Sequence, residues 1–206
     1  MRYNLHVRTS PAIAFFDLDR TLIHVNSAKG WVRREVRTGH LRRRDAARVA
    51  LWLAAYHAGW SDLDPMIRTA VASLAGADEA ELDARVAAFW AEELAHTVRP
   101  GAREAIARHR ERGDRLVILT ASSPYVAERA RAALDLHDIL CNRFEVVDGR
   151  FTGEPVLPLC YGPGKATLAR DYAARHDISL DHCAFYTDSY SDLAALEVVG
   201  EPVVVH

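Results

Sequence analysis

The chain has 206 residues, of which 50% are hydrophobic and 26% charged, and its formal net charge is −2. This balance gives no general attraction to nucleic acid, and no apolar run reaches the roughly 18 residues of a membrane-spanning helix. The first residues contain no apolar core of a signal peptide, so we expect a cytoplasmic protein. Three cysteines without CxxC spacing favour neither a disulfide framework nor a zinc site. The length suits one core domain with an insert.

The first predicted element is a buried strand over 13–16, in the sequence AIAFFDLDRTLIHV, which Asp17 and Asp19 follow at once. Ligands gather at the carboxyl ends of strands in open α/β sheets. Carboxylates placed there can hold a divalent cation or attack a phosphoryl group. Taken alone, the pair is more typical of a turn or a helix N-cap.

Residues 24–96 have an almost wholly helical pattern and form the predicted insert. Its helices are expected near 28–38, 42–58, 62–75 and 78–96, with breaks at Gly39, Gly59 and Gly76. Asp78 followed by Glu81 resembles a capping box, with Asp in the place of Ser or Thr.

The insert also holds all four tryptophans, and seven arginines crowd its first half. They are Trp31, Trp52, Trp60 and Trp90, and Arg33, Arg34, Arg37, Arg42, Arg43, Arg44 and Arg48. The favoured interpretation is a small bundle with tryptophans in its core and solvated arginines. A basic, amphiphilic surface that meets a lipid phosphate, or a homodimer contact through the insert, remains an alternative.

The turn Arg99-Pro100-Gly101 marks the return to the core. A helix over 102–112, a strand over 115–120 and a helix over 124–134 are expected next. The strand ends in Thr120, Ala121 and Ser122, and hydroxyls with free N–H groups at a helix start bind phosphate oxygens. The alternative is that a serine only caps the helix that Pro124 opens.

A strand-like stretch over 143–152 contains Asp148-Gly149, which indicates a hairpin. A helix over 164–176 follows, and Lys165 stands at its start. A lysine there can neutralise a carboxylate and a phosphate together, although a lone lysine is more often solvated. A P-loop is rejected because its required Gly and Ser/Thr positions are Leu159 and Ala166.

The last predicted elements are a strand over 183–187, a helix over 191–198 and a strand over 202–205. Asp188 and Asp192 follow the first of these; alone, they could be a turn residue and an acid at a helix start. The alternation of strands and helices predicts an α/β fold with a doubly wound, mostly parallel sheet. We expect a core domain over 1–23 and 97–206, and a helical cap domain over 24–96.

Together the polar motifs resemble those of the haloacid dehalogenase (HAD) superfamily. The order is DxDxT, a strand-end Thr/Ser, a lysine and DxxxD. Within the superfamily, the chain is similar to subfamily IB, the phosphoserine-phosphatase-like branch, which carries a helical cap after the first motif. The resemblance implies a Rossmann-like core and a phosphomonoester hydrolase that depends on Mg²⁺.

The resemblance also assigns roles in catalysis. Asp17 would be the nucleophile that forms an aspartyl-phosphate. Asp19 would be the acid for the leaving alcohol and then the base for water. Lys165 would hold charge near Asp17 and the phosphate, and Thr120, with Ala121 and Ser122, would bind phosphoryl oxygens.

For the metal, the resemblance implies Mg²⁺ bound by Asp17, the backbone carbonyl of Asp19 and Asp188. Asp192 would lie in the outer shell and orient a metal-bound water or Lys165. This chemistry suits phosphoryl transfer, which needs in-line positioning and neutralised charge.

The chain departs from the family pattern in positions that bear on the substrate. Where phosphoserine phosphatases carry an acidic residue for the substrate ammonium, this chain has Asn26, which has no formal charge. Arg68 is a loose counterpart of their carboxylate-binding arginine, and Arg20 replaces a residue that is commonly small. Phosphoserine, histidinol phosphate, another small phosphomonoester and a lysophospholipid phosphate all stay open. The alternatives to a phosphatase are a phosphotransferase and a non-enzymatic binding or regulatory module.

Overall fold

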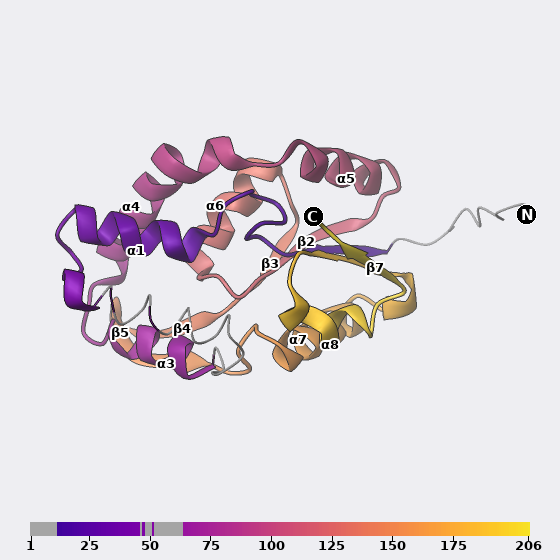
Figure 1. Ribbon diagram of the computed structural model, residues 1–206. Coiled ribbons are helices and arrows are strands. Elements are labelled where there is room, and N and C mark those ends of the chain that lie inside the picture. The colour runs from indigo at the N-terminus through magenta and orange to yellow at the C-terminus, as the bar shows by residue number, and fades with distance from the viewer. Residues whose placement is uncertain (1–11, 46, 48–50, 52–63) are drawn as a thin grey trace, which may run out of the picture.

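The computed structural model describes residues 12–45, 47, 51 and 64–206 (Figure 1). Its main sheet has five strands in the order β3-β2-β1-β6-β7. Every neighbouring pair in this sheet is parallel. The strands are β1 (Ile13–Phe16), β2 (Arg115–Leu119), β3 (Asp138–Leu140), β6 (Ala184–Thr187) and β7 (Glu201–Val204). The predicted α/β class with a parallel sheet is confirmed.

Helices cover both faces of this sheet because side chains alternate along each strand. Phe16 belongs to a core with Ile106 and Ala130, on the side of α5 (Pro100–Glu111) and α6 (Pro124–Leu134). Phe15 belongs to a second core with Ala169 and Ala195, on the side of α7 (Pro163–Arg175) and α8 (Leu193–Leu196). Figure 1 shows the two layers above and below the strands. The sheet is therefore doubly wound.

The insert contributes α1 (Ser27–Arg37), α3 (Asp64–Ala72) and α4 (Glu79–Phe89), which gather at one end of the molecule in Figure 1. Asp78 caps α4 as predicted, since its carboxylate accepts from the N–H of Glu81 at 3.1 Å. The predicted helix over 78–96 is not continuous, because a π-helical turn (Trp90–Leu94) and a 3₁₀ turn (Ala95–Thr97) follow α4. Most of the helix predicted over 42–58 lies outside the described residues.

The described tryptophans of the insert pack inward. Trp90 is buried, and Trp31 meets the ring of Phe89 edge-on, with ring centroids 5.5 Å apart. Arg34 pairs with Glu92 and Glu93 at the surface. These contacts agree with the packed-bundle interpretation; Trp52 and Trp60 lie outside the described residues.

The predicted hairpin is confirmed as β4 (Arg143–Val147) and β5 (Arg150–Val156). Asp148 and Gly149 both have positive φ, 50° and 75°, as the two-residue turn of a hairpin requires. The hairpin lies against the segment that joins α3 to α4. There the N–H of Gly76 donates to the carbonyl of Phe151 at 2.8 Å, and the N–H of Phe151 donates to Ala77 at 3.1 Å.

Two further elements differ from the sequence prediction. The edge strand β3 was not predicted, because it has only three residues and all are half-buried. The helix expected over 191–198 is a 3₁₀ turn (Tyr190–Asp192) followed by the short α8. None of the helices in the described parts of the chain is long and apolar enough to cross a bilayer.

Candidate active site

Three adjacent strands bring the predicted site residues to one edge of the sheet. Asp17 follows β1, Thr120 follows β2 and Asp188 follows β6. From β1, the chain adds β2 and β3 on one side of that strand and then β6 and β7 on its other side. The strand order therefore reverses direction at β1, which makes it the topological switch point. In open parallel sheets the ligand crevice forms at this point.

Lys165 joins two carboxylates in the interior. Its ammonium lies 2.8 Å from Oδ1 of Asp17 and 2.7 Å from Oδ2 of Asp192. All three residues are buried, with Lys165 only 2% exposed. The alternative of a solvated surface lysine is therefore wrong. Asp192 does stand at a helix start, as the N-cap of α8, but its carboxylate makes no capping hydrogen bond and bonds to Lys165 and Thr187 instead.

Burial sets the electrostatics of this group. It raises the pKa of Asp17 to about 7, even though the ammonium of Lys165 opposes the shift. Burial alone would lower the pKa of Lys165, but the carboxylates of Asp17 and Asp192 outweigh it and raise that pKa above its ordinary value. The lysine is therefore held in its charged form beside Asp17.

Asp19 lies where the insert meets the core. Its Oδ1 accepts from the N–H of Ser27, the first residue of α1, at 2.8 Å. Burial raises the pKa of Asp19, opposed by this hydrogen bond. The hydroxyl of Ser27 is 3.3 Å from that of Ser122, so the start of α1 bridges Asp19 and the loop after β2.

The loop after β2 is fixed by internal hydrogen bonds. The N–H of Ser122 donates to Oγ1 of Thr120 at 3.2 Å. The carbonyl of Ala121 accepts from the side-chain amide of Asn142 at 2.6 Å. Ser123 is the N-cap of α6 without a side-chain hydrogen bond, so the alternative that it only caps the helix is not supported.

Asn142 is a residue that the sequence analysis missed. It is 2% exposed, and its Oδ1 accepts from the N–H of Cys160 at 2.8 Å while its amide donates to Ala121. It therefore ties the loop after β2 to the segment that leads to Lys165. A single asparagine that follows the unpredicted strand β3 in the chain gives no sequence signal for this role.

Two threonines next to the aspartates were also missed. Oγ1 of Thr21 accepts from the N–H of Asp188 at 3.1 Å, which links the first motif to the last. Thr187 donates its hydroxyl to Asp192 at 2.6 Å. The sequence did contain a signal for each of them. Thr21 is the threonine of the DxDxT pattern, and Thr187 directly precedes Asp188.

The two residues predicted to read the substrate have other contacts. Asn26 is the N-cap of α1, and its side-chain oxygen accepts from the N–H of Lys29 at 2.9 Å. Arg68 pairs with Asp64, one turn earlier in α3, at 2.5 Å. Asn26 thus adjoins Ser27 at the site, whereas Arg68 has its partner within its own helix.

The carboxylates of Asp17, Asp19 and Asp188 have the chemistry that a divalent cation requires. Burial raises the pKa of Asp188, as it does for Asp17 and Asp19, so these carboxyls gain from added positive charge. Oxygen ligands of this kind suit Mg²⁺, which keeps several waters and takes few carboxylates. Within the described ranges, no three His, Cys, Asp or Glu side chains gather as a metal-binding group. The predicted ligand set, the carboxylates of Asp17 and Asp188 with the backbone carbonyl of Asp19, contains only two such side chains and stays a prediction.

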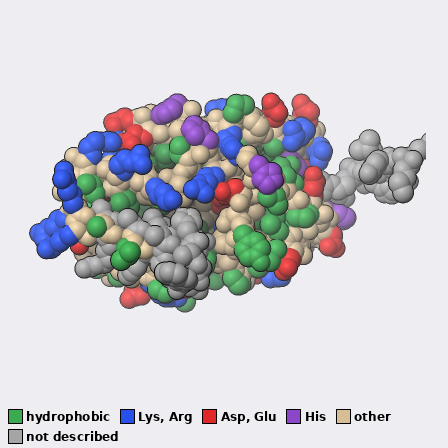
Figure 2. All heavy atoms as spheres, in the orientation of Figure 1, with side chains coloured by type: hydrophobic (Ala, Val, Ile, Leu, Met, Phe, Trp, Pro, Cys, Tyr) green, Lys and Arg blue, Asp and Glu red, His purple; other side chains and the backbone are tan. Residues whose placement is uncertain are grey.

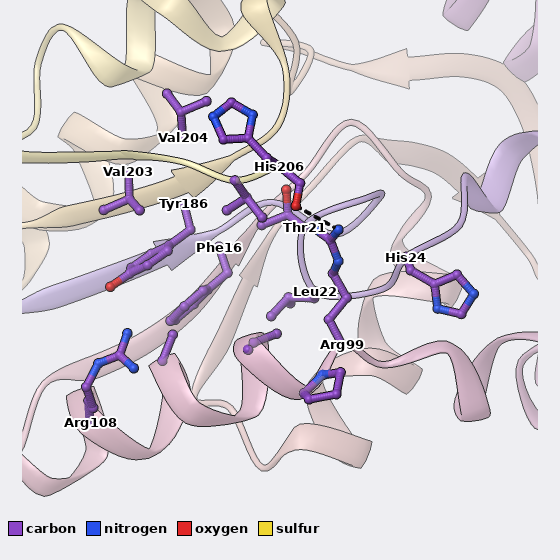
Figure 3. A pocket seen from close by; sticks show the side chains of 15 residues that line it. Phe16, Thr21, Leu22, His24, Arg99, Arg108, Tyr186, Val203, Val204 and His206 are labelled. Carbon is purple, nitrogen blue, oxygen red and sulfur yellow. Dashed lines mark hydrogen bonds between the residues drawn. The ribbon is translucent and has the colours of Figure 1, made fainter.

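A separate cavity of about 520 Å³ lies between α5 and the end of β7. Figure 3 shows Phe16, Tyr186 and Val203 along it, and Arg99 bonded to the carbonyl of His206. Its described lining includes none of the predicted site residues. The buried charges, and not the size of a cavity, therefore locate the candidate site.

This arrangement has a counterpart among known proteins. A model of the haloacid dehalogenase-like hydrolases matches residues 14–197. The chain belongs to this family. The predicted HAD membership, and with it the prediction of a hydrolase, is confirmed.

Similar proteins carry phosphatase names. A probable phosphatase of Mycobacterium tuberculosis is 33% identical over 196 residues, which cover 94% of this chain and 68% of the relative. A phosphoserine phosphatase of the same species is 31% identical, with 95% and 65% covered. A histidinol-phosphatase of Neisseria meningitidis is 27% identical, with 94% and 90% covered. This HAD chain thus spans about two thirds of the length of the mycobacterial relatives.

Solved structures show the same fold. A protein of unknown function from Bordetella pertussis has a TM-score of 0.85 and 25% identity, with 95% of this chain and 90% of that chain covered. A phosphoserine phosphatase solved as an analogue of its phospho-aspartyl intermediate has a TM-score of 0.71 and 18% identity, with 95% and 87% covered. The predicted phosphoserine-phosphatase-like fold is confirmed.

Proposed function

We propose that this HAD hydrolase is a Mg²⁺-dependent phosphomonoesterase that acts through an aspartyl-phosphate on Asp17. The observation that carries the proposal is the buried chain Asp17–Lys165–Asp192 at the switch point of the sheet. Burying two carboxylates and an ammonium is costly unless they are paired, and such groups concentrate at functional sites.

In the first step, a carboxylate oxygen of Asp17 attacks phosphorus and the bond to the leaving oxygen breaks. Asp19 gives its proton to that oxygen, which departs as an alcohol. In the second step, Asp19 takes a proton from water, the water oxygen attacks phosphorus, and the bond to Asp17 breaks to release inorganic phosphate. Burial of Asp19 supports both roles. Its raised pKa favours the protonated form needed in the first step, and it makes the carboxylate a stronger base for water in the second step.

Other residues position and stabilise the transferring group. Lys165 favours the ionised form of Asp17 against the effect of burial, and it offers positive charge to the phosphoryl oxygens. Thr120 and Ser122 place their hydroxyls at the end of β2, where α6 begins, while their backbone N–H groups hold the loop itself. Asp17, Asp188 and the carbonyl of Asp19 would hold the cation, which neutralises phosphate charge when bound.

We propose a small-molecule phosphate as the substrate. The names of the relatives, a phosphoserine phosphatase and a histidinol-phosphatase, support this class. The described part of the insert supports it too, because α1 begins against Asp19, where it would lie beside a leaving group.

The test is phosphate release from a panel of monoesters, with Mg²⁺ and with EDTA. The panel contains phosphoserine, histidinol phosphate, sugar phosphates and lysophosphatidate. We expect release that requires Mg²⁺, and a loss of at least roughly a thousandfold in Asp17→Asn. Asp171→Asn, an exposed change on α7, is the matched control. Undiminished turnover by a folded Asp17→Asn protein would overturn the mechanism.

A further inference from the structure

Arg20 is held in place directly beside the proposed acid Asp19. Its φ of 59° lies in the left-handed region, which is rare for a residue other than glycine. Its N–H donates to the carbonyl of Val25 at 3.1 Å, and its carbonyl accepts from the side chain of Arg99 at 2.8 Å. Both backbone polar groups of Arg20 are therefore held by hydrogen bonds, which fixes the position of its Cα next to Asp19.

The guanidinium of Arg20 keeps its hydrogen-bonding capacity. The side chain is 50% exposed, and its nearest acidic oxygen, Oδ2 of Asp188, is 4.0 Å away. This distance is too long for a hydrogen bond. Among the described residues, its guanidinium donates no hydrogen bond. A guanidinium with free donors is suited to a carboxylate or phosphate, which it can bind in a bidentate way.

The segment that begins at Arg20 is rich in basic residues. Residues 20–34 contain Arg20, Lys29, Arg33 and Arg34 but no Asp or Glu, and of these cations Arg34 is already paired with Glu92 and Glu93. Figure 2 shows basic side chains over the part of the molecule where Figure 1 places α1. The first acid, Glu35, is buried and bonded to Arg85 at 2.6 Å.

The same segment offers no negative charge to a substrate ammonium. Asn26 uses its side-chain oxygen to cap α1. Because the N–H of Ser27 bonds to Asp19, the start of α1 borders the space where a leaving group would lie. The charge on this wall therefore favours an anion at the far end of the leaving group.

We propose that Arg20 is a specificity-determining residue that selects phosphomonoesters whose leaving group carries a second negative charge, a carboxylate or another phosphate. The inference rests on the proposed function, since it places the leaving oxygen at Asp19, the residue before Arg20. The second anion then pairs with the guanidinium while the ester phosphate lies against Asp17, on the side open to the leaving group, with the charge of Lys165 close by.

The experiment compares esters that share one leaving-group scaffold. They are phenyl phosphate, 3- and 4-carboxyphenyl phosphate, and 4-(aminomethyl)phenyl phosphate. For each protein, kcat/KM of the charged esters is divided by that of phenyl phosphate, which cancels any general loss of activity. Comparing these ratios between variants removes the intrinsic reactivity of each ester.

We expect Arg20→Gln to lower the carboxyphenyl ratio about tenfold, since one charge-assisted hydrogen bond is worth that much. Arg20→Lys should retain part of it, and Arg20→Glu should shift the preference toward the aminomethyl ester. Arg170→Gln, which removes an exposed arginine on α7, should leave the ratios unchanged.

Unchanged ratios in Arg20→Gln, an equal loss on all esters, or the same shift in Arg170→Gln would each overturn the inference while leaving the phosphatase proposal intact. No turnover of phenyl phosphate by the wild-type protein with Mg²⁺ would instead overturn the proposed function, and this inference with it.

Discussion

At the scale of single residues, the site depends on one ammonium shared by two buried carboxylates. Lys165 is as close to Asp192 as to Asp17, 2.7 and 2.8 Å, and Thr187 adds a hydroxyl to Asp192. Removing one member of a buried ion group leaves an unpaired charge. The loss of folding stability is then larger than the net stability that the whole group contributes. Lys165 therefore serves both stability and charge at the proposed nucleophile.

Replacing Lys165 should separate these two contributions. We expect Lys165→Met to lower the free energy of unfolding by about 3 kcal/mol and to abolish most phosphate release. Adding Asp192→Asn removes one of the unpaired charges, so the double variant should regain stability without regaining activity. Urea unfolding and phosphate release measure the two effects. Recovery of both together would contradict a role for the ammonium in turnover.

Asn142 is expected to position the loop after β2. Asn142→Asp keeps an acceptor for the N–H of Cys160 but cannot donate to the carbonyl of Ala121, whereas Asn142→Leu loses both hydrogen bonds. Because the loop is proposed to bind phosphate, both changes should raise the inhibition constant of inorganic phosphate, and the leucine variant should also unfold more easily. Equal inhibition constants in Asn142→Asp and wild-type protein would exclude this role.

The four motifs predicted Asp17, Asp19, Lys165 and Asp188 through their joint order along the chain, although each motif alone has a simpler structural explanation. Asn142 could not be predicted, since its importance comes from two partners, one 21 and the other 18 positions away in the chain. Side-chain contacts over such separations leave no periodic signal.

At the scale of elements, two helices begin with the same dipeptide in different surroundings. Both α5 and α7 start with Pro-Gly, at Pro100-Gly101 and Pro163-Gly164. A Cβ added to Gly164 would lie 1.9 Å from the carbonyl oxygen of Leu159, while one added to Gly101 would meet nothing within 4 Å. Only α7 thus requires its glycine for close approach of the backbone.

This pair gives a matched test. Gly164→Ala should displace the first turn of α7 and with it Lys165, so we expect lower stability and a large loss of phosphate release. Gly101→Ala should leave activity unchanged and raise stability by about 0.5 kcal/mol, because alanine favours the helix. Thermal unfolding and kcat/KM provide the comparison. Similar behaviour of the two variants would show that the contact with Leu159 is unimportant.

Elements with strong local signals could be predicted and those without could not. Helix α6 has its predicted bounds, 124–134, because Pro124 begins it after a polar loop. The π-helical turn after Phe89 was missed, since its residues continue a helical pattern and only the hydrogen-bond register changes. The short strand β3 has too few residues to establish a pattern.

At the scale of the whole molecule, the buried carboxyls couple stability to pH and metal. Burial raises the pKa of Asp17 to about 7 and also raises those of Asp19 and Asp188. The folded protein then binds protons more tightly than the unfolded chain, whose carboxyls have a pKa near 3.8. The stabilising contribution of Asp17 is full below that value and is lost as pH rises through about 7, and those of Asp19 and Asp188 are lost in the same direction.

A divalent cation should replace these protons. We expect Mg²⁺ to raise Tm more at pH 8 than at pH 5.5, because at the lower pH it competes with bound protons. Thermal unfolding with Mg²⁺ and with EDTA at both pH values measures this difference. Asp188→Asn, which removes a proposed ligand, should diminish it. An equal rise in Tm at both values would contradict the linkage.

The bonds between the β4–β5 hairpin and the α3–α4 segment restrict how this enzyme can be recombined. Phe151 is 2% exposed and gives both its N–H and its carbonyl to residues of the insert. A chimaera that imports a foreign insert over 24–96 alone would leave these buried groups without partners, at a cost comparable to two lost hydrogen bonds. Exchange of substrate specificity between relatives should therefore succeed only when residues 143–156 are exchanged together with residues 24–96.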